Sequence, residues 1–187
     1  MTENTRRVLL VRHGRTALNA EGRLRGLADP DLDDVGVEQA HRTARALAFA
    51  GPVDLVVSSP LRRAQQTARL IAAASDAPFR ADPRFNDRDY GPWTGRVKAD
   101  VIARWGSVDD APGVEPQADV LARAMRGLDE LAEHDHELVA VVTHDAVIRP
   151  LLETIRPGIR LAVDTASWAE LETAGEGWTI RSVDNTA

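Results

Sequence analysis

The sequence of 187 residues contains no cysteine. This absence excludes disulfides, thiolate nucleophiles and cysteine-ligated zinc sites together. No apolar run approaches the ~20 residues that a membrane-spanning helix needs. The short apolar run after Arg7 is broken at Arg12, too early for the core of a signal peptide. We therefore expect a cytoplasmic protein that does not associate with membranes.

Positive charge is also in deficit, because 23 lysines and arginines face 29 aspartates and glutamates and leave a net charge of -6. Such a chain has no general attraction for nucleic acid or anionic lipid, so we expect neither as a partner. The net charge does not exclude a single cationic cleft. With 43% hydrophobic residues, the chain is long enough to bury one substantial core.

Short apolar runs rich in β-formers alternate along the chain with segments of helical periodicity. The pattern predicts strands over residues 8–11, 53–59, 78–82, 137–144, 167–173 and 178–183, and helices over 34–50, 59–74, 97–104, 119–132 and 145–155. This alternation predicts an α/β three-layer sandwich, in which helices cover both faces of a mostly parallel sheet. We expect a single domain over residues 1–187, with a small cap or substrate loop over about 91–118.

Unusual residues follow three of the predicted strands. Arg12, His13 and Gly14 end the first strand, Arg62 lies in the first turn of the helix after the second, and His144 ends the fourth. Each has an ordinary structural explanation when taken alone: a satisfied core histidine, a solvated arginine or a tight turn. Taken together, two histidines and two arginines at the carboxyl ends of strands indicate a site for an anion, because α/β sheets bind ligands there.

The helix after the second strand supports this interpretation. With Ser59 as its N-cap and Pro60 at its first position, it would direct unpaired backbone amides towards the same anion. In a pocket without cysteine, histidines and arginines suggest phosphoryl transfer to a histidine nucleophile. A neutral imidazole would attack phosphorus, arginines would neutralise the phosphoryl oxygens, and a carboxyl group would protonate the leaving oxygen.

Four segments in this order, "VRHGRTALN", "SSPLRRAQQTA", "NDRDYGPWTG" and "VVTHDAVIRPLL", resemble the histidine phosphatase superfamily with its phosphoglycerate-mutase-like fold. The segment "GRLRGLADPDLDDVGVEQA" is similar to the family's stretch leading into its first helix. The resemblance covers most of the chain, and its motifs fall at predicted strand ends. It implies a metal-independent phosphatase without a cofactor, acting on a small phosphomonoester.

The resemblance also implies roles for individual residues. His13 would be the phosphorylated nucleophile, and Gly14 would leave room for the backbone beside it. The phosphoryl group would be bound by polar side chains from several motifs: Arg12, Thr16, Asn19, Arg62 and His144.

Two aspartates are candidates for the general acid. Asp87 aligns with the family's glutamate, although its side chain is shorter by ~1.3–1.5 Å, about one C–C bond. Asp145 follows His144, as in the branch that includes phytases and acid phosphatases, but aspartates are also common in a helix's first turn. We favour Asp87 because its surrounding motif matches better, and Asp145 is the alternative. Asp89 is interpreted as a surface or salt-bridging residue, and Arg88 as a partner for either neighbour.

Other polar and aromatic residues receive no catalytic assignment. The run "PGVEP" departs from the Pro-Gly-Gly-Glu-Ser run of many relatives, and Glu115 in it is interpreted equally as a loop charge or a substrate contact. Trp93 and Trp105 are interpreted as packing residues that would alternatively line a pocket mouth. No motif surrounds the remaining histidines, which are His41, His134 and His136.

A phosphomonoester hydrolase acting through a phosphohistidine is the favoured function, and a phosphoglycerate mutase is the alternative. Mutases of this family tend to be longer, with a basic insertion that closes over the substrate. Between Gly95 and Asp119 this chain has only three cations, which are Arg96, Lys98 and Arg104. Without such closure water reaches the intermediate more easily, which favours hydrolysis.

Two further functions are weaker. The change from glutamate to aspartate leaves open a catalytically weak relative that binds phosphorylated ligands. A metallohydrolase using His13, His144 and Asp145 is disfavoured, because the neighbouring arginines would repel a cation. We therefore expect no metal ion. The sequence leaves open a homodimer and the identity of the substrate.

Overall fold

The computed structural model describes residues 5–173 and 177–187. Its strands are β1 (Arg6–Arg12), β2 (Leu55–Ser58), β3 (Phe79–Ala81), β4 (Leu138–Thr143), β5 (Trp168–Thr173) and β6 (Trp178–Asn185). Its α-helices are α1 (Ala17–Ala20), α2 (Asp34–Ala50), α3 (Arg62–Ser75), α4 (Lys98–Trp105), α5 (Gln117–Glu133) and α6 (Asp145–Ile155). Two 3-10 turns, η1 (Pro83–Phe85) and η2 (Gly91–Trp93), lie between β3 and α4.

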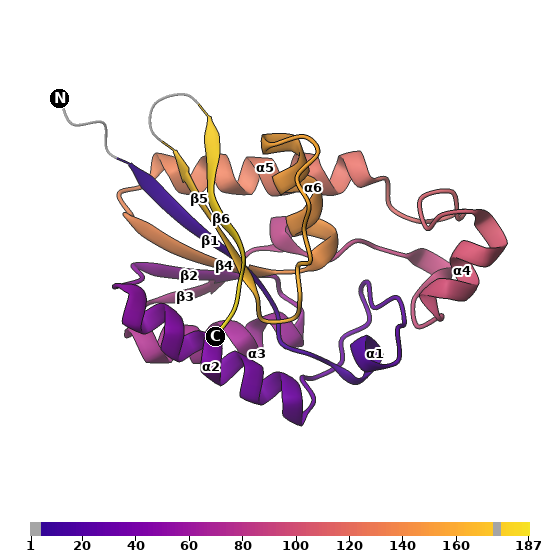
Figure 1. Ribbon diagram of the computed structural model, residues 1–187, viewed down its shortest axis with the longest axis horizontal. Coiled ribbons are helices and arrows are strands. Elements are labelled where there is room, and N and C mark those ends of the chain that lie inside the picture. The colour runs from indigo at the N-terminus through magenta and orange to yellow at the C-terminus, as the bar shows by residue number, and fades with distance from the viewer. Residues whose placement is uncertain (1–4, 174–176) are drawn as a thin grey trace.

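The six strands form one sheet in the order β3-β2-β4-β1-β5-β6. β1, β2, β3 and β4 are parallel to one another, β5 is antiparallel to β1, and β6 is antiparallel to β5. Helices cover both faces, α5 and α6 on one side and α2 and α3 on the other (Figure 1). The predicted α/β sandwich with a mostly parallel sheet is therefore confirmed.

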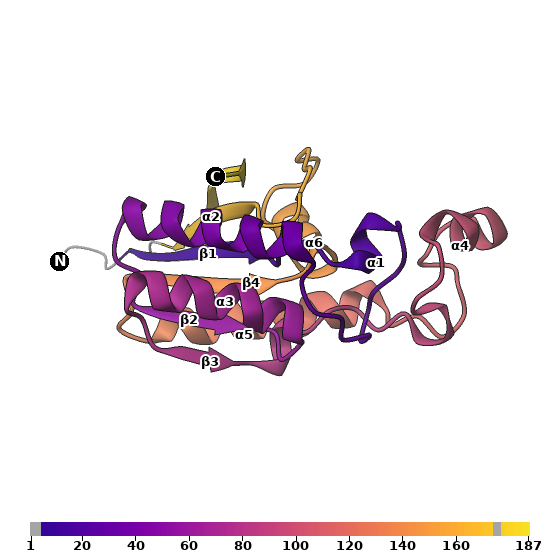
Figure 2. The ribbon, with the colours of Figure 1, turned by 90° about the horizontal axis from the view of Figure 1, so that it is seen from below.

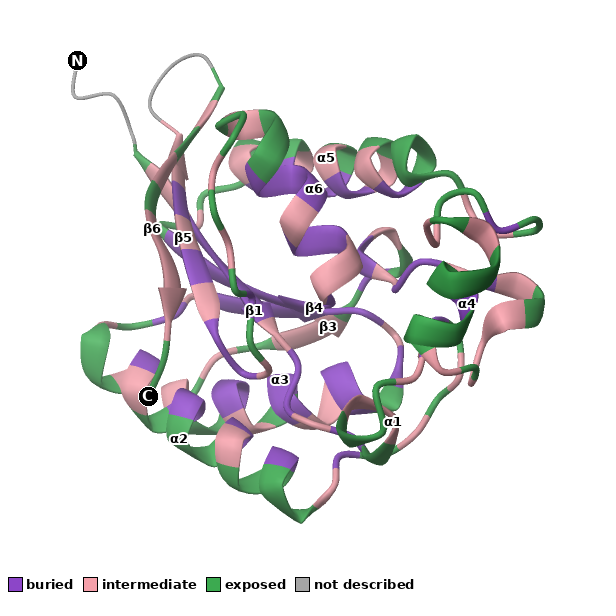
Figure 3. Ribbon diagram, turned by 45° about the vertical axis from the view of Figure 1, so that its right-hand side comes forward, coloured by how far each residue is buried: buried purple, intermediate pink, exposed green. Residues whose placement is uncertain are grey.

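Two hydrophobic clusters hold the layers together. Side chains alternate across a strand, so β1 sends Val8 and Leu10 to the cluster under α5 and α6, and Leu9 and Val11 to the cluster under α2 and α3. The central strands are buried on both faces, and each helix buries only its inner stripe (Figure 3). This rigid sheet fixes the positions of the residues that follow its strands.

The start of α3 differs from the sequence prediction. We expected Ser59 as the N-cap and Pro60 at the first helical position, but Leu61 is the N-cap and the helix begins at Arg62. The reason is local, because the Ser59 hydroxyl accepts a hydrogen bond from the Leu61 amide at 3.2 Å and holds residues 59–61 in a turn. The Arg62 amide donates to Asp29 at 2.6 Å, so this amide is already occupied. The first turn of α3 therefore lacks the free amide row that we expected.

A small outlying substructure extends beyond the end of the sheet opposite the N-terminus, where Figures 1 and 2 show α1 and α4. Its apolar cluster is separate from the two main ones and comes from residues 24, 90, 101 and 111, with partly buried aromatic and aliphatic neighbours. Trp93 and Trp105 pack edge to face within it, with ring centroids 5.7 Å apart. The two tryptophans therefore hold this substructure together.

Two glycines let the loop after β1 touch the first turn of α2. A Cβ on Gly36 would lie 2.0 Å from the Arg15 carbonyl oxygen, and a Cβ on Gly14 would lie 2.4 Å from the Gly36 carbonyl oxygen. The Gly14 amide donates to the Thr67 hydroxyl at 3.1 Å, so the loop is fastened to α3 as well. Gly14 thus provides space, as expected, but the space is taken by the backbone of α2.

We predict that Gly36→Ala destabilises the protein, although alanine is the better helix former by about 1 kcal/mol. The added Cβ meets backbone that cannot move without displacing the loop, and such overpacking costs about 1–3 kcal/mol. Denaturant unfolding measures the effect, with Val37→Ala at the exposed neighbouring position as a control. A gain in stability for Gly36→Ala would contradict this contact.

Candidate active site

The carboxyl ends of three parallel strands meet at one edge of the sheet. Arg12 pairs with Thr143 across β1 and β4, and Ser58 pairs with Val142 across β2 and β4. The residues after β1 and β4 are therefore neighbours. The rings of His13 and His144 lie with their centroids 5.1 Å apart, and both side chains are fully buried.

The tautomer of His13 follows from its hydrogen bond. Its Nδ1 lies 2.6 Å from the carbonyl oxygen of Gly14. A carbonyl can only accept, so Nδ1 carries the proton and donates it. Nε2 then holds a lone pair, and it has no hydrogen-bond partner in the described part of the chain. His13 thus presents an unprotonated ring nitrogen that is suited to attack an electrophile.

Both histidines are uncharged. Burial lowers the pKa of His13 well below its ordinary value, and His144, Arg63 and Arg12 lower it further. Burial likewise lowers the pKa of His144, followed by the charges of Arg63, Arg25 and Arg12. Nδ1 of His144 lies 3.6 Å from Oδ2 of Asp87, but because the ring is neutral this contact is not an ion pair.

We predict that stability falls as the pH drops below about 6.5, the ordinary histidine pKa. Below that pH the unfolded chain protonates both histidines and the folded chain does not, so the unfolded state is favoured. Each histidine contributes a slope of up to about 1.4 kcal/mol per pH unit. His144→Gln should reduce the acid slope relative to the wild type. Equal acid slopes in the wild type and His144→Gln would contradict neutral burial.

The structure separates two consecutive arginines. Arg62, which we expected to bind phosphate, has a side chain 59% exposed and bonds to Asp31 at 2.5 Å. Arg63 is fully buried and donates to Oδ2 of Asp87 at 2.8 Å. It also donates to the carbonyls of Gly26 at 2.9 Å and Ala28 at 2.6 Å. Arg63, and not Arg62, belongs to the cluster around the histidines.

Arg25 is a second residue of the cluster that the sequence did not predict. It lies in the loop whose carbonyls bind Arg63, and its charge lowers the pKa values of both buried histidines. Its Nη1 reaches only the Arg23 carbonyl, at 3.4 Å, and its Nε is buried without a hydrogen-bond partner among the described residues. Arg25 is thus a further cation of the cluster.

Several buried nitrogens of this cluster lack a hydrogen-bond partner in residues 5–173 and 177–187. They are Nε of Arg12, Arg25 and Arg63, Nε2 of His13, and both ring nitrogens of His144. Buried polar atoms normally have partners, so a group of unpartnered nitrogens is unusual. The concentration of arginines fits an anion with several oxygens, such as a phosphoryl group.

The two candidate acids occupy different environments. Asp87 is 1% exposed, with Oδ2 bonded to Arg63 and Oδ1 accepting from the Arg88 amide at 2.9 Å. Asp145 is the first residue of α6, is partly exposed, and binds Arg149 at 2.9 Å. Asp87 therefore lies within the histidine–arginine cluster, and Asp145 lies at its border.

The remaining acidic residues near Asp87 shape its loop. Glu115 accepts from the Asp89 amide at 2.9 Å and binds Arg123 at 3.2 Å, and Arg123 donates to the Asp87 carbonyl at 3.0 Å. Asp89 caps the Gly91 amide at 2.8 Å. Glu115 thus has a structural role, because it anchors the segment that carries Asp87.

Thr16 and Asn19 form a capping box at the start of α1. The Asn19 side-chain oxygen accepts from the Thr16 amide at 3.0 Å and from its hydroxyl at 2.8 Å. Thr16 is fully buried. The two residues we expected to bind phosphate therefore fix the shape of the loop after His13.

A cavity of about 310 Å³ lies next to the cluster, between α4 and the start of α6. Its wall is partly charged and partly apolar, and includes Leu24, Tyr90, Lys98, Ile102, Asp145 and Arg149. A volume of this size is at the lower end for small-molecule pockets.

The described part of the chain shows neither a metal site nor a membrane span. Within residues 5–173 and 177–187 no group of three or more histidine, aspartate or glutamate side chains could hold a metal ion. No helix in the same residues is long and apolar enough to cross a membrane. His134 and His136 follow the C-terminal end of α5, away from the cluster, with ring centroids 6.4 Å apart.

Comparison with known proteins decides the family. Residues 8–186 match the profile of the histidine phosphatase superfamily, branch 1. The chain belongs to this superfamily. A glucosyl-3-phosphoglycerate phosphatase of Mycolicibacterium vanbaalenii is 33% identical over 192 residues, covering 89% of this chain and 84% of that protein.

Two further proteins are similar to this chain, one in sequence and one in fold. A bifunctional protein of Mycobacterium tuberculosis is 36% identical over 171 residues, covering 86% of this chain and 45% of that protein, so the chain spans about half the length of that relative. A mycobacterial glucosyl-3-phosphoglycerate phosphatase solved with VO3 is 27% identical, with a TM-score of 0.81 over 97% of this chain and all of that one. The predicted family is therefore confirmed.

The shift from Arg62 to Arg63 has a signal that could have been found in the sequence. Arg63 precedes Ala64, Thr67 and Ala68, which are buried on the inner stripe of α3. Arg63 lies one helical turn before the buried Thr67 and so shares its inward face, whereas Arg62 lies one turn before Gln66, which is not buried. The helical phase of α3 thus distinguishes the two arginines.

Proposed function

We propose that this protein hydrolyses phosphomonoesters through a phosphohistidine formed on His13. The observation that carries the proposal is the unprotonated, unpartnered Nε2 of His13 among buried arginines. Membership of the histidine phosphatase superfamily supports it, as does the relative named as a phosphatase. The chemistry needs no metal ion, because arginines supply the positive charge.

Two steps complete the proposed reaction. Arg12, Arg25, Arg63 and His144 bind the phosphoryl group while the lone pair on His13 forms the nitrogen–phosphorus bond. The ester bond breaks, and the leaving oxygen takes its electron pair and a proton from a carboxyl group. Water then attacks phosphorus, the same carboxylate accepts its proton, and His13 leaves with the electron pair.

Asp87 is our proposed acid, and its bond to Arg63 suggests how it is released. A phosphoryl dianion competes with the Asp87 carboxylate for the Arg63 guanidinium. Once Arg63 binds the phosphoryl group, Oδ2 of Asp87 is free to hold a proton near the leaving oxygen. Asp145, which borders the 310 Å³ cavity, is the alternative.

We predict that Asp87→Asn slows phosphorylation of His13 by an alkyl phosphate about 100-fold or more, because an aliphatic alkoxide needs a proton to leave. p-Nitrophenyl phosphate should be affected much less, since its leaving group is already stable. Rapid-quench measurement of the phosphoenzyme gives both rates. Asp145→Asn tests the alternative acid. Asp119→Asn is the control for loss of a carboxylate, because Asp119 is an exposed acidic residue in the first turn of α5. A leaving-group-dependent loss in Asp145→Asn alone would transfer the acid role to Asp145.

The substrate is proposed to be a small phosphorylated metabolite whose leaving group enters the 310 Å³ cavity. Residues 91–118 contribute Lys98, Ile102 and Val108 to that cavity, and we propose that this segment selects the substrate. The name of the M. vanbaalenii relative makes glucosyl-3-phosphoglycerate one compound to test.

A panel of phosphomonoesters, assayed with a chelator and no added metal, tests the function as a whole. We expect phosphate release that persists with the chelator and disappears in His13→Ala. Transfer between phosphoglycerate positions without release would instead support the mutase. Phosphate binding without turnover across the panel would support a binding protein.

A further inference from the structure

The loop between α6 and β5 forms hydrogen bonds with the Arg12 side chain and with the backbone of Arg12 and His13. Nη1 of Arg12 donates to the carbonyl oxygen of Val163 at 2.5 Å, which is the one hydrogen bond of its guanidinium within the described residues. The Ala166 amide donates to the carbonyls of Arg12 and His13 at 3.1 Å each. The orientation of Arg12 therefore depends on where the Val163 carbonyl points.

That loop has an unfavourable backbone conformation. Val163 has φ 50° and Ala166 has φ 63°, both in the left-handed region. A β-branched residue rarely adopts this region, so Val163 needs a specific interaction to keep it there. Conformations of this kind gather at functional sites, where the surrounding contacts impose them.

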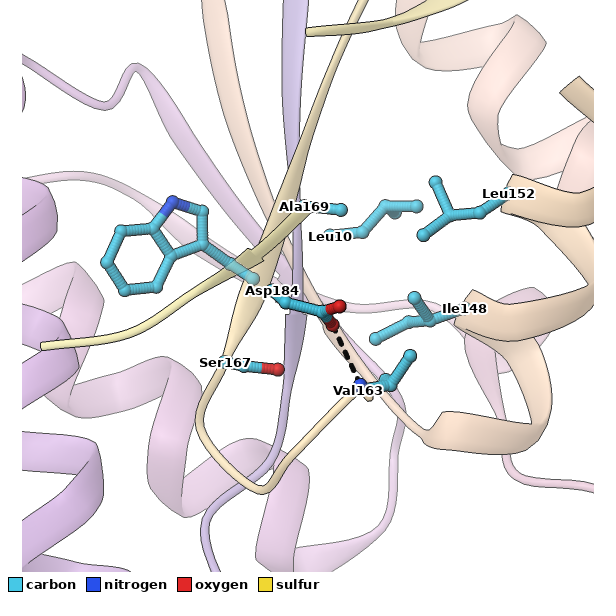
Figure 4. A pocket seen from close by; sticks show the side chains of 8 residues that line it. Leu10, Ile148, Leu152, Val163, Ser167, Ala169 and Asp184 are labelled. Atoms are coloured by element: carbon cyan, nitrogen blue, oxygen red, sulfur yellow. Dashed lines mark hydrogen bonds between the residues drawn. The ribbon is translucent and has the colours of Figure 1, made fainter. Parts of the chain in front are cut away.

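Asp184 supplies this interaction. Its Oδ1 accepts from the Val163 amide at 2.8 Å, and its Oδ2 accepts from the Ala162 amide at 3.0 Å. Figure 4 shows the carboxylate beside the Val163 amide, next to the apolar side chains of Leu10 and Ile148. The hydrogen bond to the Val163 amide is partly buried, whereas the hydrogen bond to the Ala162 amide is exposed.

The sheet register explains why Asp184 points towards this loop. Trp168 pairs with Asn185 and Glu170 pairs with Ser182, so one residue of β5 faces two of β6. The additional residue is a β-bulge, and Asp184 within it has φ 52°. A bulge redirects side chains. Here it turns a strand carboxylate towards the backbone of the preceding loop.

We propose that Asp184 is a positioning residue for phosphoryl binding. Its carboxylate accepts hydrogen bonds from the amides of Ala162 and Val163 and thereby fixes the direction of the Val163 carbonyl. That carbonyl in turn accepts from Arg12 and orients its guanidinium. This rests on the proposed function only through the role of Arg12 in binding the phosphoryl group. Asp184 itself does not touch the substrate. Its effect on phosphate is therefore indirect and requires Arg12.

The proposal predicts a change in phosphate affinity opposite in sign to the change that charge alone would cause. Removing a carboxylate near an anion site should strengthen anion binding, whereas releasing Arg12 should weaken it. We expect Asp184→Ala to weaken binding of inorganic phosphate about 10-fold, the loss of one charge-assisted hydrogen bond. Asp184→Asn, which keeps one acceptor, should lie between Asp184→Ala and the wild type.

A double-mutant cycle with Arg12→Ala tests the route of the effect, with phosphate affinity measured by calorimetry. In the Arg12→Ala background, Asp184→Ala should change phosphate affinity less than about 2-fold. Asn185→Ala is the matched control, because the Asn185 side chain lies in the same bulge and its hydrogen bonds go to Trp168 and Ser182. It should leave phosphate affinity unchanged.

Two results would overturn the proposal: unchanged phosphate affinity in Asp184→Ala, or an equal loss with and without Arg12. The second result would mean that Asp184 affects phosphate binding by a route that does not involve Arg12. Turnover of phosphomonoesters is measured separately. A protein without turnover that still shows the Arg12-dependent loss would overturn the proposed hydrolysis and support the role of Asp184.

Discussion

Replacing Arg63 with alanine is expected to lower kcat/KM for phosphomonoesters by about 1,000-fold, in the range known for arginines that stabilise phosphoryl transfer. Replacing Arg62, its neighbour, should have little effect, because its exposed side chain pairs with Asp31 at the surface. The two substitutions remove the same side chain at consecutive positions. They therefore compare a guanidinium inside the cluster with one outside it.

Arg63→Ala also leaves Asp87 as an unpaired buried carboxylate, which costs about 3–5 kcal/mol of folding stability. Arg63→Lys separates the two effects, because lysine keeps a positive charge beside Asp87 but loses the planar fork that binds two phosphoryl oxygens. A folded Arg63→Lys variant with a large loss of kcat/KM supports the account. Full activity in Arg63→Lys or Arg63→Ala, or a large loss in Arg62→Ala, would contradict it.

Replacing His13 with asparagine is expected to lower kcat by about 10,000-fold or more, as for other enzymes that lose their nucleophile. Asparagine retains a side chain of similar polarity near the Gly14 carbonyl but offers no nitrogen lone pair for attack. Because the arginines remain, we expect the variant to bind inorganic phosphate still. Steady-state kinetics and calorimetry measure these two properties separately.

The same substitution at His144 is the informative comparison. His144 binds the phosphoryl group in our account and forms no covalent bond to it, so His144→Asn should lose less activity than His13→Asn and should still become phosphorylated. Equal phosphorylation of His13→Asn and the wild type would show that the nucleophile is another residue.

The strand ends could be predicted from the sequence because the chemistry changes abruptly there. Buried strands read as continuous apolar runs, so the polar residues after Val11 and Val142 mark the edge of the sheet. Parallel neighbours then bring His13 and His144 together, as their 5.1 Å ring separation shows. The local sequence pattern was sufficient to predict that the two histidines lie together, because the pairing of parallel strands brings their ends to one edge of the sheet.

Other parts of the site depend on contacts that no local pattern contains. Because the Ser59 hydroxyl stabilises a turn over residues 59–61, α3 begins at Arg62, later in the chain than predicted. Arg25 joins the cluster only because its loop folds back onto Arg63. Asp184 is 172 positions after Arg12 in the chain and meets its loop through a β-bulge. These are tertiary effects, and no spacing of residues along the chain indicates them.

The most direct test of the central claim is to trap the phosphorylated enzyme. The protein is mixed with a labelled phosphomonoester, quenched under alkaline conditions that preserve phosphohistidine, digested and analysed by mass spectrometry. We predict an acid-labile phosphoryl group on the peptide that contains His13, absent in His13→Asn and present in Arg62→Ala. A label on another residue, or substrate hydrolysis by His13→Asn at the wild-type rate, would contradict the mechanism.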